Sequence, residues 1–401
     1  LLAWGDVRLG ALLAGEHGSS RGHVVQLRTV AEAVQDRFTF DAALCDLTFK
    51  DELAGLCDAV QGPWLPYSGD YRESRGSPPR ATWGEFLGDY GFLNPETLRE
   101  SIAWWQGVMR ECDISLVIAD CAPCALMAAR GLGIPAIAIG TGYLVPPAEM
   151  QEFPVLLPRY STRIYDEAEI VDTINSVVPE FGVPKLDRLP QVYMSSDQLA
   201  FTIGMLDPYS ESRRQPLLPP IIGGEAEPVS GGEEVFVYFS TRAQSSPELI
   251  EAIGSLGVPV RVFIPGIDDE VADGLAQRGV LVERSPVPVD LVAKRSRLLV
   301  NAAQHGTLCL GLATGIPQVA APQQWEQQYN AEAVEKYGVL KVASEAERSA
   351  EHFRALVLHA CEDAAMARRS RGLADELRPQ LQANRRKLIR RRISSVMDFK
   401  V

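Results

Sequence analysis

The sequence predicts an α/β protein built from two Rossmann-like domains, each a doubly wound parallel sheet flanked by helices. Three observations predict this class. At 401 residues the chain is too long for one ordinary core, and its 46% hydrophobic content is typical of a globular protein of about two domains. Short β-rich runs alternate with helical stretches in both halves. A segment rich in glycine, proline and acidic residues, 219–232, reads as an exposed linker between the halves.

The N-terminal half shows this alternation at both of its ends. A β-rich run at 9–16 leads into an amphipathic stretch at 24–36 and an alternating run at 38–45. Between about 47 and 110 the pattern is less clear, with glycine, proline and four tryptophans in irregular and helical surroundings. The alternation then resumes with a predicted strand, helix and strand at 114–119, 125–130 and 135–139.

The C-terminal half predicts a second doubly wound sheet and a helical end. Its five predicted strands, with helices between them, lie at 235–240, 259–264, 280–282, 298–300 and 318–321. We therefore expect an acceptor-binding domain over 1–224, a second domain over 225–380, and a C-terminal helix over 381–401 that can pack back onto the first domain. The basic runs in that helix are expected to be a solvated face, with an anionic-membrane patch as the alternative.

Charge and composition favour a small-molecule partner. The formal net charge of -13 argues against broad nucleic-acid binding, which needs an excess of Lys and Arg. No apolar run is long enough for a membrane-spanning helix, and the first ten residues carry no recognisable secretion signal. The seven scattered cysteines fit reduced thiols. We expect a cytoplasmic protein, and the sequence leaves both a monomer and a homodimer possible.

Two polar residues follow strands of the first domain. His23 ends a turn of small residues that follows the first strand, and Asp120 closes the strand at 114–119. Side chains at the carboxyl ends of parallel strands face the crevice where such folds bind ligands. A neutral His23 there can take a proton from a hydroxyl, and Asp120 can fix its tautomer. The alternatives are a packing or capping histidine and an aspartate that caps the helix near Pro123.

The second domain offers an anion seat and a polar pair. The strand at 298–300 runs into a loop and a helix that starts near His305, Gly306 and Thr307. Backbone N–H groups at a helix start suit a diphosphate. Glu326 and Gln327 follow the next strand and can bind neighbouring sugar hydroxyls, although residues of this kind often just open a surface helix.

These motifs resemble a known family when taken together. HGT at 305–307, GIPQ at 315–318, P-x-x-x-EQ at 322–327 and NA at 330–331 occur in the order and spacing of the donor-binding signature of family 1 nucleotide-sugar glycosyltransferases. The turn ending in RGH at 21–23 is similar to the N-terminal motif of the same enzymes. The residues IAD at 118–120, followed by a helix and GIP at 133–135, match the position of its aspartate partner. The resemblance covers nearly the whole chain except 47–110.

The resemblance implies a fold, a reaction and site residues. The fold would be GT-B, two Rossmann-like domains facing a central cleft. The enzyme would be an inverting glycosyltransferase acting on a natural-product-like small molecule, without metal or cofactor, and its co-substrate would be a UDP- or dTDP-linked sugar. His23 would be the general base and Asp120 its partner. Donor contacts would come from Ser240, Thr241, Arg242, Val287, His305, Gly306, Thr307, Glu326 and Gln327.

Two positions depart from the family pattern. Ala302 stands where the signature commonly has a diphosphate-binding histidine, and Leu310 stands where many members have a ribose-binding glutamate. Two side chains that would be expected to bind the diphosphate and the ribose of the donor are therefore missing. Our hypothesis is that His305 and Arg242 supply the lost positive or donating groups, because an arginine presents a rigid fork to phosphate oxygens.

The acceptor is expected to contact tryptophans from the irregular interval. Trp64, Trp83 and Trp104 are candidates for an apolar wall beside His23, since aromatic rings bury area and grip flat ligands. Ordinary core packing explains these residues equally well. An aromatic or macrocyclic acceptor fits this reading, and a lipid is not excluded.

Three other functions compete with sugar transfer. The main rival is a GT-B-shaped protein that binds a ligand or a partner enzyme without turnover, as Ala302 and Leu310 would suggest. An epimerase acting on nucleotide sugars is a second, although the Glu-Gln pair does not support it. The third reads Cys121-Ala-Pro-Cys124 as a thioredoxin-like dithiol at a helix start.

Overall fold

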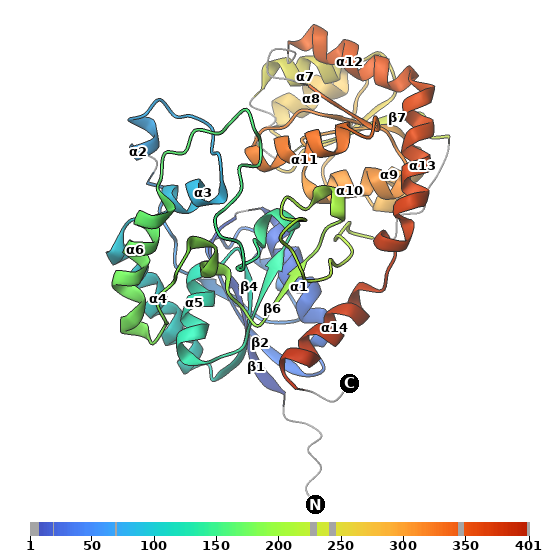
Figure 1. Cartoon of the computed structure of the whole chain (residues 1–401). Coiled ribbons are helices and arrows are strands. Elements are labelled where there is room, and N and C mark those ends of the chain that lie inside the picture. The colour runs from blue at the N-terminus through green and yellow to red at the C-terminus, as the bar shows by residue number, and fades with distance from the viewer. Residues whose placement is uncertain are drawn as a thin grey trace, which may run out of the picture. The chain divides into compact units, whose positions relative to one another are not determined.

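The computed structural model describes residues 8–18, 20–68, 70–224, 231–239, 246–343 and 349–398. The chain divides into two compact units (Figure 1). Unit 1 comprises residues 1–219 together with 384–401, and unit 2 comprises residues 220–383. The division lies a few residues before the predicted boundary at 224/225.

Unit 1 contains a six-stranded parallel sheet in the order β3-β2-β1-β4-β5-β6. This is the Rossmann strand order, whose switch point lies between β1 and β4. Five 3₁₀ turns connect or extend the elements: η1 (Lys50–Leu53), η2 (Gly142–Leu144), η3 (Val178–Phe181), η4 (Leu189–Tyr193) and η5 (Gly204–Leu206). The strands and helices are β1 (Leu9–Gly15), α1 (Arg21–Val34), β2 (Phe38–Leu44), β3 (Ala59–Gln61), α2 (Asp70–Glu73), α3 (Trp83–Asp89), α4 (Pro95–Glu111), β4 (Ile114–Asp120), α5 (Pro123–Leu132), β5 (Ala136–Gly140), α6 (Glu167–Val177), β6 (Asp197–Ala200) and α14 (Arg385–Val396).

Unit 2 contains a second parallel sheet with the equivalent order, β12-β11-β10-β7-β8-β9. Its switch point lies between β7 and β10. The elements are β7 (Glu234–Tyr238), α7 (Pro247–Gly254), β8 (Val260–Phe263), α8 (Asp269–Gln277), β9 (Leu281–Glu283), α9 (Val289–Arg295), β10 (Ser296–Asn301), α10 (His305–Thr314), β11 (Gln318–Ala320), α11 (Trp325–Glu335), β12 (Leu340–Val342), α12 (Ala350–Glu362) and α13 (Ala364–Leu381).

The central strands form where the sequence is continuously apolar. In β4, six of the seven residues are buried, and all five residues of β5 are buried, as expected for strands covered by helices on both faces. The short strands β3, β6 and β12 were not predicted. They have three, four and three residues and each includes a polar residue, whereas the equally short β9 was found from the apolar run 280–282.

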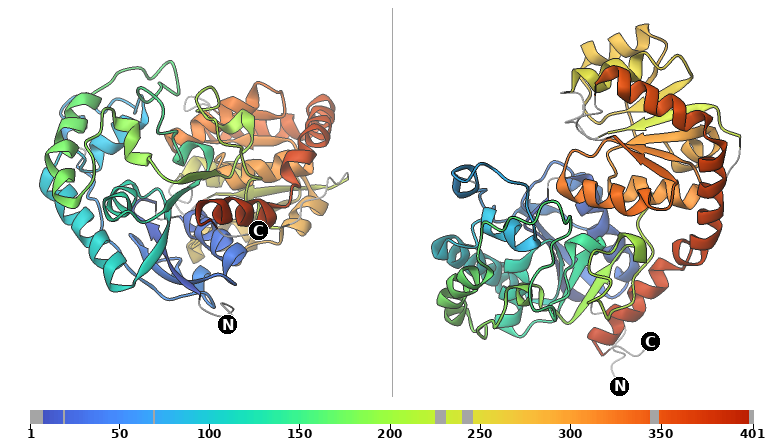
Figure 2. Two further views of the ribbon diagram at one scale, coloured as in Figure 1. Left: turned by 60° about the horizontal axis from the view of Figure 1, so that its bottom comes forward. Right: turned by 45° about the horizontal axis from the view of Figure 1, so that its top comes forward.

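Helix α14 belongs to unit 1 and packs on α1 and β6 (Figure 2). Ile389 and Ile393 are buried in this contact. Arg390 forms an ion pair with Asp36, and the Arg392 Nε atom donates to Asp197 Oδ2 at 2.6 Å. The expectation of a solvated basic face was therefore wrong for these two arginines. Their acidic partners lie far away in the sequence, so no local pattern indicated the ion pairs.

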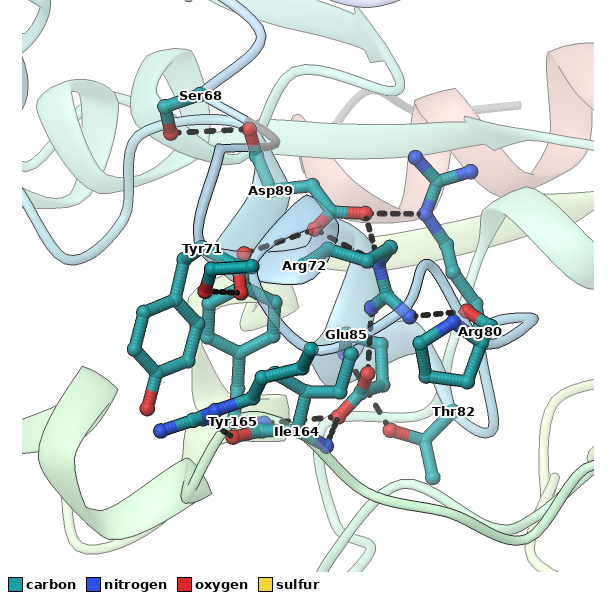
Figure 3. A network of polar contacts seen from close by, with 12 residues as sticks. Ser68, Tyr71, Arg72, Arg80, Thr82, Glu85, Asp89, Ile164 and Tyr165 are labelled. Atoms are coloured by element: carbon teal, nitrogen blue, oxygen red, sulfur yellow. Dashed lines mark hydrogen bonds and ion pairs between the residues drawn. The ribbon is translucent and has the colours of Figure 1, made fainter.

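The irregular interval is organised by a buried network of charges (Figure 3). The Arg72 guanidinium donates to both carboxylate oxygens of Asp89, at 3.0 and 3.1 Å, and also pairs with Glu85. Arg80 and the Tyr165 hydroxyl donate to Asp89 as well, at 2.6 and 2.8 Å. Buried charges need such partners. The network thus connects α2 and α3 with the chain before α6, in an interval that also contains the long helix α4.

Candidate active site

The two polar residues predicted to meet do lie together at the switch point of unit 1. Gly15, the last residue of β1, pairs with Asp120, the last residue of β4. After β1 the chain turns into α1, whose N-cap is Ser20, so that His23 lies in the first turn of the helix. Both side chains therefore project from the carboxyl end of the sheet, where folds of this type place ligands.

His23 and Asp120 form a close pair. The distance from His23 Nδ1 to Asp120 Oδ2 is 2.6 Å. The Asp120 side chain is fully buried, and the His23 side chain is 18% exposed. Burial raises the pKa of Asp120, and the neighbouring His23 opposes that rise. With Asp120 ionised, Nδ1 carries the proton and Nε2 carries the basic lone pair, which is the arrangement needed for proton abstraction.

Gly18 lies against the reactive edge of His23. Its φ of +100° is in a region that side chains rarely adopt. A Cβ atom built on Gly18 would lie 2.1 Å from His23 Nε2, far inside van der Waals contact. Only glycine therefore allows the loop to pass this close to the imidazole.

Glu16 is a buried carboxylate that the sequence analysis did not single out. It follows β1 directly and is 1% exposed. Its two oxygens accept the backbone N–H groups of Cys124 and Ala125, at 3.0 and 2.6 Å, in the first turn of α5. Burial raises its pKa to about 8. A lone acidic residue directly after a run of buried apolar residues was the signal available in the sequence.

This contact distinguishes the two roles predicted for Asp120. The N-cap of α5 is Ala122, and its side chain provides no capping hydrogen bond. The N–H groups of Cys124 and Ala125, which have no intrahelical acceptor, donate to Glu16 instead. Asp120 binds His23 and is not seen capping α5.

His17 is a second buried residue that was not predicted. Its imidazole lies edge-on to Phe86 and Tyr90, with ring centroids 5.2 and 5.0 Å away. Burial, with a smaller effect from His23, lowers its pKa to about 3. His17 is therefore neutral at ordinary pH and adds no positive charge beside His23.

In unit 2, the start of α10 follows the switch-point strand β10. Asn301 ends β10, and its Oδ1 accepts the N–H of Ala303 at 2.7 Å. Ala303 has a left-handed φ of 59°, so the chain turns sharply before the helix begins at His305. His305, Gly306 and Thr307 form the first turn of α10, where backbone N–H groups lack intrahelical acceptors. The helix therefore begins where the sequence predicted it, and anion binding there stays a prediction.

The fold comparisons agree with this architecture. No protein-family model and no curated protein matches the chain. Among solved structures, the spinosyn rhamnosyltransferase SpnG is 16% identical, with a TM-score of 0.68 over 96% of this chain and 100% of that chain. The calicheamicin glycosyltransferase CalG4 is 14% identical, with a TM-score of 0.69 over 98% and 99% of the two chains. The glycosyltransferase VinC, solved in complex with dTDP, is 15% identical, with a TM-score of 0.64 over 97% and 99%.

This chain has the GT-B fold. The predicted fold class is thereby confirmed: two six-stranded parallel sheets are present, and the similarity to these glycosyltransferases extends over almost the whole length of both chains. SpnG has also been solved with the spinosyn aglycone and with thymidine diphosphate.

The other residues predicted to bind the donor have varied surroundings in this GT-B chain. Gln327 is buried near the start of α11, and its Oε1 accepts the N–H of Gln323 at 2.8 Å. Glu326, beside it, is half-buried. Val287 is half-buried in the loop between β9 and α9. Ser240, Thr241 and Arg242 lie outside the described residues.

The departures from the family pattern are packed positions in this GT-B chain. Ala302 is fully buried and Leu310 is 7% exposed. Burial lowers the pKa of His305 to about 4, so His305 is neutral near pH 7. A neutral imidazole can still donate a hydrogen bond, so the role of His305 as a donating group stays a prediction. Its proposed partner Arg242 is not described.

The three candidate acceptor tryptophans lie in different environments of unit 1. Trp83 is 1% exposed, and its Nε1 donates to the Tyr193 hydroxyl at 2.7 Å, so it is a core residue in this structure. Trp104 is half-buried on α4, edge-on to Trp105. Trp64 is 59% exposed. The half-buried rings of Phe86 and Tyr90, which contact His17, were not predicted.

The cysteine pair lacks the properties of a redox dithiol. Cys121 and Cys124 are both buried, and burial raises the pKa of Cys124 well above its usual value. A reactive dithiol needs the opposite shift and an accessible sulfur. Within the described ranges there is no cluster of three or more His, Cys, Asp or Glu residues that could hold a metal. None of the helices in those ranges has the length and apolar character needed to cross a membrane.

Proposed function

We propose that this GT-B protein transfers a sugar from a nucleotide diphosphate to a hydroxyl group of a small-molecule acceptor. The observation that carries the proposal is the 2.6 Å contact between His23 and the buried Asp120 at the switch point of unit 1. A structural histidine has little need of a fully buried carboxylate partner, whereas a general base does. Retention of Glu326 and Gln327 at the start of α11 supports the same function.

The proposed reaction is a single displacement. His23 Nε2 takes the proton from the acceptor hydroxyl as its oxygen forms a bond to the anomeric carbon. The bond between that carbon and the diphosphate breaks, and the leaving group departs with the electron pair. Asp120 stabilises the imidazolium that results. Attack from the face opposite the leaving group inverts the anomeric centre. The positioned base is expected to contribute about 10²–10⁴-fold in rate.

The donor is proposed to bind unit 2 as a thymidine or uridine diphosphate sugar. The N–H groups in the first turn of α10 suit diphosphate oxygens and would favour the charge that develops on departure. Glu326 would bind sugar hydroxyls, and no metal would be required. The dTDP complexes of VinC and SpnG support a thymidine nucleotide as the first choice.

Thermal melting with nucleotides provides the first test. We expect dTDP or UDP to raise the melting temperature, because a ligand that binds only the folded state stabilises it. GDP is the matched control, with the same diphosphate and a different base. Mass spectrometry should then detect a glycosylated product when polyketide-type acceptors are added with the corresponding sugar nucleotide. Absence of any nucleotide-dependent shift would contradict the proposal.

A non-catalytic GT-B protein is the second candidate. It is favoured by Ala302 and Leu310, which are packed residues without a polar group that could bind the sugar nucleotide. This candidate predicts that an acceptor-like ligand raises the melting temperature while no sugar nucleotide is consumed. Release of free nucleotide diphosphate in the presence of acceptor would exclude it.

A further inference from the structure

Two buried carboxylates lie side by side at the switch point of unit 1, and they have different partners. Glu16 follows β1 and Asp120 ends β4, and the register pairs Gly15 with Asp120. Glu16 accepts two backbone N–H groups of α5, and Asp120 accepts from His23. The two carboxylates thus begin from adjacent strand ends and have separate tasks.

The turn between Asp120 and α5 is strained. Cys121 has a φ of 47°, in the left-handed region that is unfavourable for a residue with a side chain. Such conformations persist only where the surrounding structure fixes them. The bonds from Glu16 to Cys124 and Ala125 hold the end of this turn in place, and the β4 strand holds its beginning.

Removal of Glu16 is expected to draw the Asp120 carboxylate away from His23. Its Oδ1 atom is buried and has no hydrogen-bond partner among the described residues. Loss of Glu16 would leave the N–H groups of Cys124 and Ala125 without an acceptor, which is costly inside a protein. Asp120 lies two residues before the N-cap and has an acceptor oxygen without a partner, so we expect its carboxylate to turn toward these N–H groups and to lose part of its alignment with His23.

We propose that Glu16 is a positioning residue, which caps α5 and fixes the strained turn so that the Asp120 carboxylate stays directed at His23. Glu16 links the loop between β1 and α1, which leads to His23, to the helix that follows Asp120. A protonated carboxyl retains acceptor capacity, so the cap does not depend on the charge of Glu16. The catalytic consequence of this inference rests on the proposed function, but the structural claim does not.

The test compares Glu16→Ala, Glu16→Gln, Asp120→Asn and Asn94→Ala in the full chain. Asn94 caps α4 at the surface by accepting the N–H groups of Glu96 and Thr97, so its replacement removes a two-bond cap elsewhere in unit 1. The readout is NMR of histidine-labelled protein, which follows the Nδ1-bound proton of His23 and the titration midpoint of its imidazole. Comparison with His23→Ala assigns the signals among the five histidines.

We expect Glu16→Ala to weaken the Nδ1 proton signal and to move the titration midpoint of His23 by about one pH unit in the direction of Asp120→Asn. Glu16→Gln keeps an acceptor oxygen and should restore most of the wild-type signal. Asn94→Ala lowers the melting temperature through a cap distant from the site and should leave the His23 signal unchanged. If Glu16→Ala does not fold, Glu16→Leu, which fills a similar volume and offers no acceptor oxygen, takes its place in the comparison with Glu16→Gln.

A His23 signal and titration that are identical in the wild type, Glu16→Ala and Glu16→Gln would overturn the inference. This readout needs no sugar transfer. Failure of the proposed function would therefore show itself in the nucleotide and transfer assays, whereas failure of the positioning role would show itself in the His23 spectrum.

Discussion

At the residue scale, three side chains and one glycine define the candidate site. His23 and Asp120 form a hydrogen-bonded pair, and Glu16 caps the helix that follows Asp120. Gly18 lacks the Cβ atom that would clash with the imidazole of His23. Sequence reasoning found the first two because they follow strands of a recognisable fold. It missed Glu16, because a capping bond between residues more than a hundred positions apart has no local pattern.

Gly18→Ala is predicted to disable the site with little effect on unit 2. The new Cβ would lie 2.1 Å from His23 Nε2 and would push the imidazole away from its position. We expect transfer to fall by about 10²-fold or more, since the contribution of the base is lost. The nucleotide-induced shift in melting temperature should persist. Assays of product formation and thermal melting measure the two effects.

Gly22→Ala is the control for this change. A Cβ at Gly22 would approach nothing closer than the Ser20 Oγ atom, at 3.8 Å, so transfer should stay near the wild-type rate. Equal losses in the two alanine variants would mean that the loop conformation, and not the space beside His23, limits the reaction.

Glu16→Gln is predicted to change how stability depends on pH. The pKa of Glu16 is raised from 4.5 to about 8 in the folded protein, so between these values the native state holds a proton that the unfolded chain has lost. The free energy of unfolding of the wild type therefore falls as pH rises through this window. Glutamine does not titrate. The stability of Glu16→Gln relative to the wild type should increase from pH 5 to pH 8, as measured by urea denaturation. A constant difference would show that Glu16 titrates as it does in the unfolded chain.

At the element scale, the strands were predictable and the connections were not. The central strands, such as β4 and β5, are continuous apolar runs and were found within a few residues of their bounds. The strands β3, β6 and β12 were missed because polar residues interrupt them, whereas the edge strand β9 was found from the apolar run 280–282. Helix α14 was predicted as a helix, but its docking through Arg392 depends on an aspartate in β6 that no local pattern connects to it.

The irregular interval depends on its buried charges. The side chains of Arg72, Glu85 and Asp89 are only 6%, 1% and 0% exposed. Arg72→Ala would leave two carboxylates buried without this partner, so we expect a loss of about 3–5 kcal/mol in the free energy of unfolding. Chemical denaturation followed by tryptophan fluorescence measures it. Arg75→Ala removes an exposed arginine of the same segment and should cost about 1 kcal/mol or less. Similar losses in both variants would contradict a structural role for the network.

At the scale of the whole molecule, the sequence predicted the two Rossmann-like units because each carries its own series of alternating strands and helices. The C-terminal motifs also predicted that the residues from His305 to Thr307 would begin a helix, as they do. The acceptor contacts were harder to predict. Whether Trp83 is a core residue or a ligand contact depends on packing around it, and the sequence alone gave equal support to both.

The most direct measurement is sugar transfer by His23→Ala set against its affinity for nucleotide. Our account predicts that the variant loses product formation by about 10²–10⁴-fold, while dTDP or UDP raises its melting temperature as much as it raises that of the wild type. Transfer at the wild-type rate would contradict the role of His23 as the base. An equal loss of transfer and of the nucleotide-induced shift would make His23 a structural residue.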